Sequence, residues 1–218
     1  MPRINRFDYL ADDIFVHVRI QINNGDFRFC EKKHFFLFQD IAKRYLKKYP
    51  SIKLCDFLWM SSHAHFILYV GIASELPKFM HDLCWRFAFE FNKIHKRKGH
   101  FFQQRYRCSV VDSDRYAMAC QRYIYRNQLR ANMVKRLKDT KWSSYSYYAY
   151  GKKDPLITPL RTYFQFGHTK KKRQLEFRIF VEQMLPHEEE LWRARLLHPE
   201  LKTKKEILQN YLKKFHIV

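Results

Sequence analysis

Two histidines separated by one residue, His63 and His65, are the first candidates for chemistry in this sequence. They lie in the segment HAHFILYV at 63–70, whose composition predicts a strand. Side chains two positions apart on a strand project from the same face, so both imidazoles can reach one point. Neighbouring imidazoles often begin a divalent-metal site, although a chance pair is also expected in a chain with eleven histidines.

A phenol and an amide are placed to join such a site. Tyr123 and Asn127 are four residues apart in a predicted helix over 114–127, so they share a face, while Gln128 is rotated about 100° further round. A helix beside the histidine strand would bring the phenol and an amide oxygen to the metal. Tyr123 also fits a core aromatic residue whose hydroxyl reaches the surface. Tyr116 and Tyr125 are alternative nucleophiles, but Tyr125 faces elsewhere on the helix.

The elements that must position these residues alternate between strands and helices. The pattern predicts strands over 14–22, 52–60, 63–70 and 101–111, and helices over 31–49, 74–98 and 114–127, with a turn at 23–26. This order favours an α+β fold in which helices pack on an antiparallel sheet.

The composition describes a basic protein with enough apolar residues for a core. The 218 residues include 20 Phe and 14 Tyr, and 42 Lys and Arg stand against 21 Asp and Glu, for a formal charge of +21. Such a charge points to nucleic acid or to an anionic membrane surface as partner, or serves solubility alone. The longest apolar stretch, 57–70, is too short and too polar to span a bilayer. Five scattered cysteines without a CxxC pair indicate buried thiols in a reducing cytoplasm.

The composition of the sequence changes near residue 150. The segment GKKDPLITP at 151–159 contains one Gly and two Pro and is interpreted as a linker after a domain over 1–150. Residues 160–218 are interpreted as a basic helical C-terminal extension. Its run of four basic residues at 170–173 fits either a solvated helix start or a phosphate-binding patch.

Several arginines lie close in sequence to the helix that carries Tyr123. They are Arg105, Arg107, Arg115, Arg122, Arg126 and Arg130. We assign a DNA-binding role to all of these except Arg115, because basic residues can follow a phosphate backbone beside aromatic platforms for single-stranded bases. For any one of them, a solvated helix face is an equally simple interpretation.

Four motifs, in order, resemble those of the single-tyrosine HUH transposases. The segment MSSHAHFIL at 60–68 is similar to that family's MPNHVHLL segment, and GHFFQQRY at 99–106 to its GHLWQGRY strand. RYIYRNQLRA at 122–131 resembles RYIHLNPVRA, and WSSY at 142–145 matches the family's WSSY. The resemblance covers about residues 10–150. FRIFVE at 177–182 is similar to a segment in the tail of the REP-associated tyrosine transposase branch.

The resemblance implies a ferredoxin-like or RRM-like HUH core and a role for each candidate residue. His63 and His65 would ligate Mg²⁺ or Mn²⁺, Tyr123 would be the nucleophile, and Asn127 the third ligand, with Gln128 as the competitor for that role. The implied activity is cutting and joining of hairpin-associated single-stranded DNA in the bacterial cytoplasm, near the nucleoid, by a monomer or a homodimer. Ser61 and Ser62 replace the family's Pro-Asn, and Gln128 replaces its Pro, which should let the helix continue.

Two other functions remain compatible with the sequence. A non-catalytic nucleic-acid-binding protein could keep the fold without metal or nucleophile. A metal-dependent hydrolase could use His63 and His65 to activate water, which would leave free 5′-phosphate products and no protein–DNA adduct.

Overall fold

A single antiparallel sheet forms the centre of the computed structural model, which describes residues 10–23, 29 and 31–183. Its strands are β1 (Ile14–Gln21), β2 (Ile52–Trp59), β3 (His63–Val70) and β4 (Arg107–Val111), in the order β2-β3-β1-β4. Three antiparallel ladders join them, and a register shift between Leu54 and Asp56 interrupts the pairing of β2 with β3. The expected α+β fold with an antiparallel sheet is confirmed.

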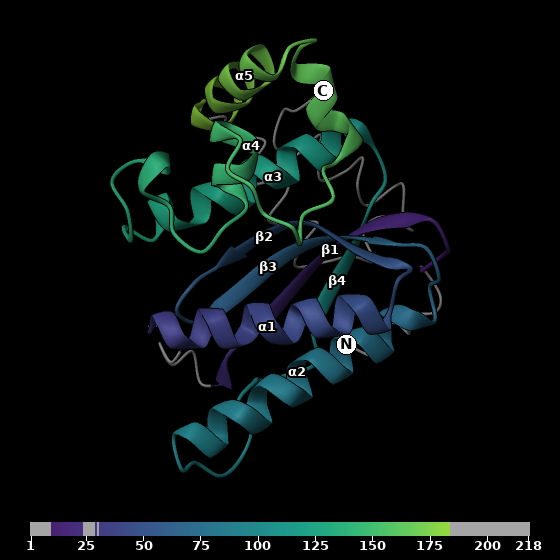
Figure 1. The fold of residues 1–218 in the computed structure, drawn as a ribbon, viewed down its shortest axis with the longest axis vertical. Coiled ribbons are helices and arrows are strands. Elements are labelled where there is room, and N and C mark those ends of the chain that lie inside the picture. The colour runs from purple at the N-terminus through teal and green to yellow at the C-terminus, as the bar shows by residue number, and fades with distance from the viewer. Residues whose placement is uncertain (1–9, 24–28, 30, 184–218) are drawn as a thin grey trace, which may run out of the picture.

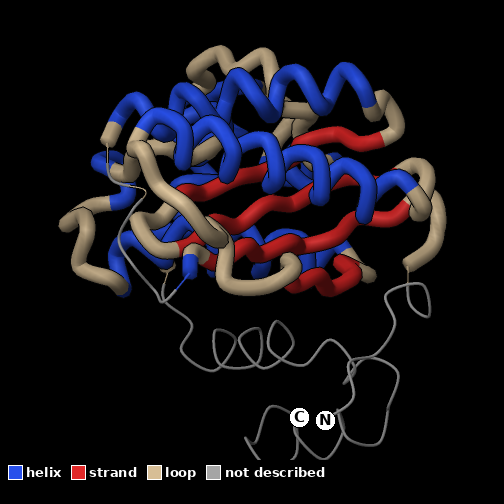
Figure 2. The backbone as a smooth tube through the Cα atoms, turned by 90° about the horizontal axis from the view of Figure 1, so that it is seen from below, coloured by secondary structure: helices blue, strands red, loops and turns tan. Residues whose placement is uncertain are grey.

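One face of the sheet is apolar and is covered by two long helices, α1 (Lys32–Lys48) and α2 (Glu75–Ile94). Figure 2 shows these helices lying over the strands. The alternation of strand side chains directs Val16, Val18 and Ile20 of β1 to this face, where they are 0–2% exposed, together with Phe66 and Leu68 of β3. Burial of this apolar surface supplies most of the driving force for the packing.

The opposite face carries both polar and apolar side chains and lies under the second half of the chain. There α3 (Asp114–Arg130), η3 (Leu137–Asp139), α4 (Tyr145–Tyr150), η4 (Arg161–Phe166) and α5 (Lys170–Glu182) gather, as Figure 1 shows above the sheet. Strand alternation and register direct one set of side chains toward these elements: His17, Arg19, Gln21, Asp56, His63, His65, Arg107 and Ser109. The candidate chemistry therefore lies between the sheet and α3.

The strands and helices predicted up to residue 127 are present, with three notable differences in length. The helix predicted over 74–98 ends at Ile94. The strand expected over 101–111 is confined to 107–111, because Phe101 turns into the core against Phe87 and Phe91 and only Phe102 makes an isolated bridge, to Ile22. Helix α3 continues past Asn127 to Arg130, as expected from Gln128 in place of a proline. Most of the turn predicted at 23–26 lies outside the described residues.

The segment interpreted as a linker runs along the sheet edge. The Thr158 N–H donates to the Leu54 carbonyl over 2.8 Å, and Ile157 bridges Leu54 in parallel. Helix α5 buries Phe177 and Val181 in the same hydrophobic core as the sheet. The predicted division into a domain, a linker and an extension stays a prediction, and residues 184–218 of that extension lie outside the described part of the chain.

Four of the five cysteines lie within the described residues, and all four are free. Burial raises the pKa of the Cys55 thiol to about 12, so it stays protonated and packs as an apolar group, in line with the sequence interpretation. Among the described helices, none is both long and apolar enough to cross a bilayer.

Candidate active site

His63 and His65 lie on the face of β3 that looks toward α3. Gln21 and Arg19 of β1 are their partners in the ladder, and Leu58 of β2 flanks His65 on the other side. The two imidazole centroids are 5.0 Å apart and the rings are nearly perpendicular, at 83°. The structure thus brings together the two imidazoles whose spacing suggested a shared site.

Each imidazole has a neighbour at Nδ1, which leaves Nε2 as the atom that could bind a cation. Ser62 Oγ lies 3.1 Å from His63 Nδ1, and His17 Nε2 lies 2.9 Å from His65 Nδ1. The Nε2 atom of His65 is buried and has no hydrogen-bond partner within the described part of the chain. A buried polar atom without a partner is costly, and a bound divalent cation would satisfy it.

Burial keeps both imidazoles neutral, as metal ligation requires. Desolvation, aided by the Arg19 charge, lowers the pKa of His63 to about 4. Desolvation also lowers the pKa of His65 well below its usual value, with further contributions from His17 and His63. A neutral pair that presents nitrogen atoms to one point fits a divalent cation.

His17 is a site residue that the sequence analysis missed. Its ring stacks on that of His65 with centroids 5.1 Å apart and an interplanar angle of 8°. It is 1% exposed, and desolvation lowers its pKa to about 3, so it is neutral and can accept a hydrogen bond from His65 Nδ1. The available signal was strand alternation, which places His17, Arg19 and Gln21 on one face of β1.

Tyr123 of α3 lies against the histidine pair. Its ring centroid is 5.8 Å from that of His65, and the rings are nearly perpendicular, at 87°. The side chain is half-buried at the edge of the core. The Arg130 guanidinium lies 4.5 Å above the phenol ring and donates from Nη2 to the Tyr123 carbonyl. The phenol ring of Tyr123 therefore lies beside His65 and remains partly exposed to solvent.

The two alternative tyrosines of α3 lie in the interior. Tyr125 is 0% exposed, and its hydroxyl donates to Oδ1 of the buried Asp56. Tyr116 is 1% exposed and packs near β4 in a small apolar cluster. Of these three tyrosines, Tyr123 is the one that borders the imidazoles.

Asn127 and Gln128 have different environments. The Asn127 Nδ2 donates to the carbonyls of Tyr123 and Ile124, over 2.9 and 3.2 Å, so the amide oxygen is the end that the helix does not use. Gln128 is 3% exposed, and its Nε2 donates to the carbonyls of Trp59 and Lys141. The Lys141 N–H donates to Gln128 Oε1, so both ends of this amide are engaged in joining α3 to β2.

A buried carboxylate, Asp56 of β2, anchors α3 over the sheet. Gln121 Nε2 donates to Oδ2 over 2.6 Å, and the hydroxyls of Tyr125 and Ser144 donate to Oδ1. Burial raises the pKa of Asp56 to about 6, against the opposing effect of these hydrogen bonds. The network holds α3 at Gln121 and Tyr125, on either side of Tyr123. The sequence signal for it was a single Asp within the apolar strand 52–59.

The WSSY segment at 142–145 belongs to the same anchor. Ser144 Oγ accepts from the Phe57 N–H over 2.9 Å, and the Trp59 N–H donates to the Trp142 carbonyl. The Trp142 ring stacks on Phe35 with centroids 4.3 Å apart. This segment therefore positions the sheet edge and the carboxylate.

The five arginines assigned to DNA lie in three different environments. Arg105 and Arg107 are exposed and line a polar pocket with Arg19, Gln21, Gln103 and Gln104, which adjoins the histidine pair through the β1–β3 ladder. Arg130 covers the Tyr123 ring. Arg122 is 4% exposed and stacks on Phe180 at 3.8 Å, while Arg126 donates to the carbonyls of Val181 and Glu182. These last two arginines join α5 to α3.

A family model described as "Transposase IS200 like" matches residues 26–127. The chain is also similar to a solved REP-associated tyrosine transposase bound to a REP hairpin, with 14% identity, coverage of 74% of this chain and 96% of that one, and a TM-score of 0.58. A protein from Deinococcus radiodurans R1, described as a transposase, is 14% identical and covers 56% of this chain and 94% of its own, with a TM-score of 0.40. No curated protein matches the sequence.

These matches confirm two predictions made from the sequence. The resemblance to the single-tyrosine transposases is confirmed by the family model, and the fold by the REP-associated structure. The family match also supports the prediction of an enzyme of the transposase class.

Proposed function

We propose that this protein is a transposase that cuts and rejoins single-stranded DNA through a covalent bond to Tyr123. The observation that carries the proposal is the contact between the Tyr123 phenol and His65, whose buried Nε2 has no hydrogen-bond partner within the described residues. A nucleophile beside vacant metal-ligand atoms is the arrangement that phosphoryl transfer to a side chain needs.

His63 and His65 would hold the cation through Nε2, and the Asn127 amide oxygen would complete the protein ligands. Both ends of the Gln128 amide are already hydrogen-bonded, which supports Asn127 over Gln128 as the third ligand. The resemblance to the HUH transposases implies Mg²⁺ or Mn²⁺ as the ion, and when bound it would polarise the scissile phosphate and stabilise the charge of the transition state. His17 would fix the His65 tautomer with the proton on Nδ1.

The Tyr123 oxygen would attack the scissile phosphorus in line with the leaving 3′-oxygen. A bond forms between the phenolic oxygen and phosphorus, and the bond from phosphorus to the 3′-oxygen breaks. The phenol gives up its proton, and the 3′-oxygen gains one to become a hydroxyl. The 5′-phosphotyrosine conserves the phosphodiester free energy, so another 3′-hydroxyl can reverse the step and join strands.

Arg19 would assist the phenol. Burial lowers the pKa of Arg19, Tyr123 opposes that shift, and Arg107 adds to it. A phenol ordinarily has a pKa near 10, and a neighbouring guanidinium stabilises negative charge that develops on its oxygen. Arg19 would therefore favour the attacking form of Tyr123 without acting as the base.

The DNA would enter along the pocket beside the histidine pair. Arg105 and Arg107 would contact phosphates, and Gln103 and Gln104 offer hydrogen-bond donors and acceptors to bases. The REP hairpin on the similar structure and the net charge of +21 support a hairpin-bearing single strand as substrate. Such a substrate would place the protein at the nucleoid.

One chain supplies both the imidazoles and the tyrosine, which favours action as a monomer. A homodimer that exchanges α3 would instead require the Asp56 anchor to form between chains. Size-exclusion chromatography with mass detection separates the two states.

A labelled hairpin-bearing single strand incubated with the protein and Mn²⁺ tests the proposal on a denaturing protein gel. We expect a labelled band at the mass of the protein that disappears in Tyr123→Phe and persists in the control Tyr45→Phe on α1. A free 5′-phosphate product without an adduct would favour a hydrolase. DNA binding without cleavage, unaltered in Tyr123→Phe, would favour a non-catalytic binding protein.

A further inference from the structure

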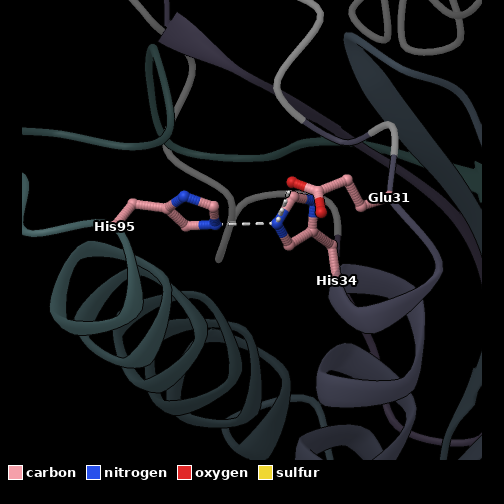
Figure 3. Close-up of side chains that lie close together, drawn as sticks. All are labelled: Glu31, His34 and His95. Carbon is pink, nitrogen blue, oxygen red and sulfur yellow. Dashed lines mark hydrogen bonds and ion pairs between the residues drawn. The ribbon is translucent and has the colours of Figure 1, made fainter.

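Three potential metal ligands meet at the ends of the two helices on the apolar side of the sheet. Glu31 is the N-cap residue of α1, His34 lies in the first turn of that helix, and His95 is the C-cap residue of α2. Figure 3 shows the carboxylate of Glu31 and the ring of His95 directed at the ring of His34. The group is separated by the sheet from His63 and His65, which face α3.

The ligand atoms of the three side chains are close enough to share one cation. His34 Nε2 lies 2.8 Å from His95 Nε2 and 3.6 Å from Glu31 Oε1, and the three ligand atoms all lie within 4.8 Å of one another. Two imidazole nitrogens and one carboxylate oxygen form a set that zinc accepts, with a fourth position left for water.

We propose that Glu31, His34 and His95 form a second cation site, separate from the site at His63 and His65, that takes Zn²⁺ or a similar transition metal. Metal–nitrogen bonds of about 2.0–2.1 Å at a tetrahedral centre require roughly 3.3 Å between the two nitrogens. The Nε2 atoms must therefore move apart by about half an ångström from their present hydrogen-bonded separation. His95 is partly exposed at a helix end, and its side chain can make that adjustment.

The protonation states of the ligands suit a cation. Burial lowers the pKa of His34, which keeps its imidazole neutral near pH 7. A hydrogen bond from Lys33 lowers the pKa of Glu31, so the carboxyl group is ionised. Lys33 Nζ contacts Oε2, 2.9 Å away, whereas Oε1 is the oxygen nearer to His34.

The site is accessible from solvent and supported from within. The Glu31 side chain is 51% exposed, and His34, at 2% exposed, is held between the rings of Phe29 and Phe91. The two more accessible ligands, Glu31 and His95, give a cation an entry path. Because His34 is already held in place, less conformational entropy is lost when the cation binds. Bound metal would link the start of α1 to the end of α2, and because it binds the folded state alone it would stabilise the fold.

Zinc titration by calorimetry tests the proposal, in a His63→Ala/His65→Ala background that removes the first site. We expect one equivalent of Zn²⁺ to bind, and Co²⁺ to give the visible absorption of a tetrahedral centre. Adding Glu31→Gln or His95→Ala should weaken binding at least 10-fold, because loss of even a supporting group commonly costs that much. His81→Ala, at an exposed histidine of α2 with 74% of its side chain accessible, is the matched control and should bind normally.

Circular dichroism on each variant confirms that the comparison is made between folded proteins. Absence of stoichiometric Zn²⁺ binding in the background variant would overturn the proposal and leave a structural hydrogen bond between His34 and His95. Binding that either Glu31→Gln or His95→Ala leaves unchanged would overturn the three-ligand set. The result is independent of the adduct assay, which depends on Tyr123.

Discussion

The imidazole of His17 stacks on that of His65, and its Nε2 lies 2.9 Å from His65 Nδ1. The two residues are adjacent in space because β1 pairs with β3 in the centre of the sheet. This contact engages Nδ1 of His65, whereas its Nε2 has no hydrogen-bond partner among the described residues. An imidazole oriented in this way is prepared for ligation before any cation arrives.

Replacing His17 by another ring should weaken metal binding at the proposed site without leaving a cavity beside His65. His17→Phe keeps a ring against His65 but removes the hydrogen bond to Nδ1. We expect the Mn²⁺ concentration for half-maximal adduct formation to rise roughly 10–100-fold, the usual effect of losing a group that orients a ligand. His100→Phe, at an exposed position, is the control. An unchanged Mn²⁺ concentration for half-maximal adduct formation in His17→Phe would show that His17 does not orient His65.

Substitution of Asn127 should affect adduct formation, whereas substitution of Gln128 should affect the stability of the fold. Asn127→Ala should leave the free energy of unfolding within about 1 kcal/mol of the parent and strongly reduce adduct formation, because the proposed ligand is lost. Gln128→Ala should lower the free energy of unfolding by about 1–3 kcal/mol, since it leaves the buried Trp59 carbonyl and the Lys141 carbonyl without their donor. Urea denaturation and the adduct assay, run on both variants, measure the two effects. The reverse pattern would make Gln128 the ligand.

Asp56→Asn should loosen the anchor of α3. Donors from Gln121, Tyr125, Ser144 and the Phe57 backbone face the carboxylate, and an amide nitrogen would oppose at least one of them. We expect the free energy of unfolding at pH 7 to fall by about 1–3 kcal/mol. Adduct formation should fall as well, because Tyr123 would be held less firmly. Full stability together with full activity would show that the carboxylate does not position the helix.

The same variant should change the dependence of stability on pH. The pKa of Asp56 is about 6 in the folded protein and 3.8 for an unperturbed carboxyl group, so between these values the folded state binds the extra proton. Its contribution to stability is therefore complete below about pH 4 and is lost as the pH rises through 6, by on the order of 3 kcal/mol. The difference in unfolding free energy between parent and Asp56→Asn, measured from pH 4 to 7, should shrink as the pH rises. A difference that does not vary with pH would contradict the raised pKa.

Local sequence patterns were sufficient to predict the order of the elements and the residues that share a face within one element. The composition of 63–70 predicted the bounds of β3, and helical spacing put Tyr123 and Asn127 on one face of α3. The partners that come from other elements were not predictable in this way. His17 meets His65, and Asp56 meets Gln121, only because strand order and helix docking bring distant segments together.

The contacts made by individual polar side chains also could not be predicted from the sequence. Arg122 and Arg126 lie in a basic stretch that suggested DNA, yet their guanidinium groups join α3 to α5. Strand 101–111 was overestimated because Phe101 and Phe102 are as typical of a core-packing loop as of a strand. Burial and long-range contacts decide such cases, and they depend on the complete fold.

Identification of the residue joined to DNA tests the central claim most directly. Trypsin cleavage after Arg122 and Arg126 releases residues 123–126, which contain both Tyr123 and Tyr125. Fragmentation of the nucleotide-linked peptide by mass spectrometry should place the 5′-phosphate on Tyr123. A phosphate on Tyr125 or on any other residue, or cleaved DNA with no linked peptide, would contradict the account.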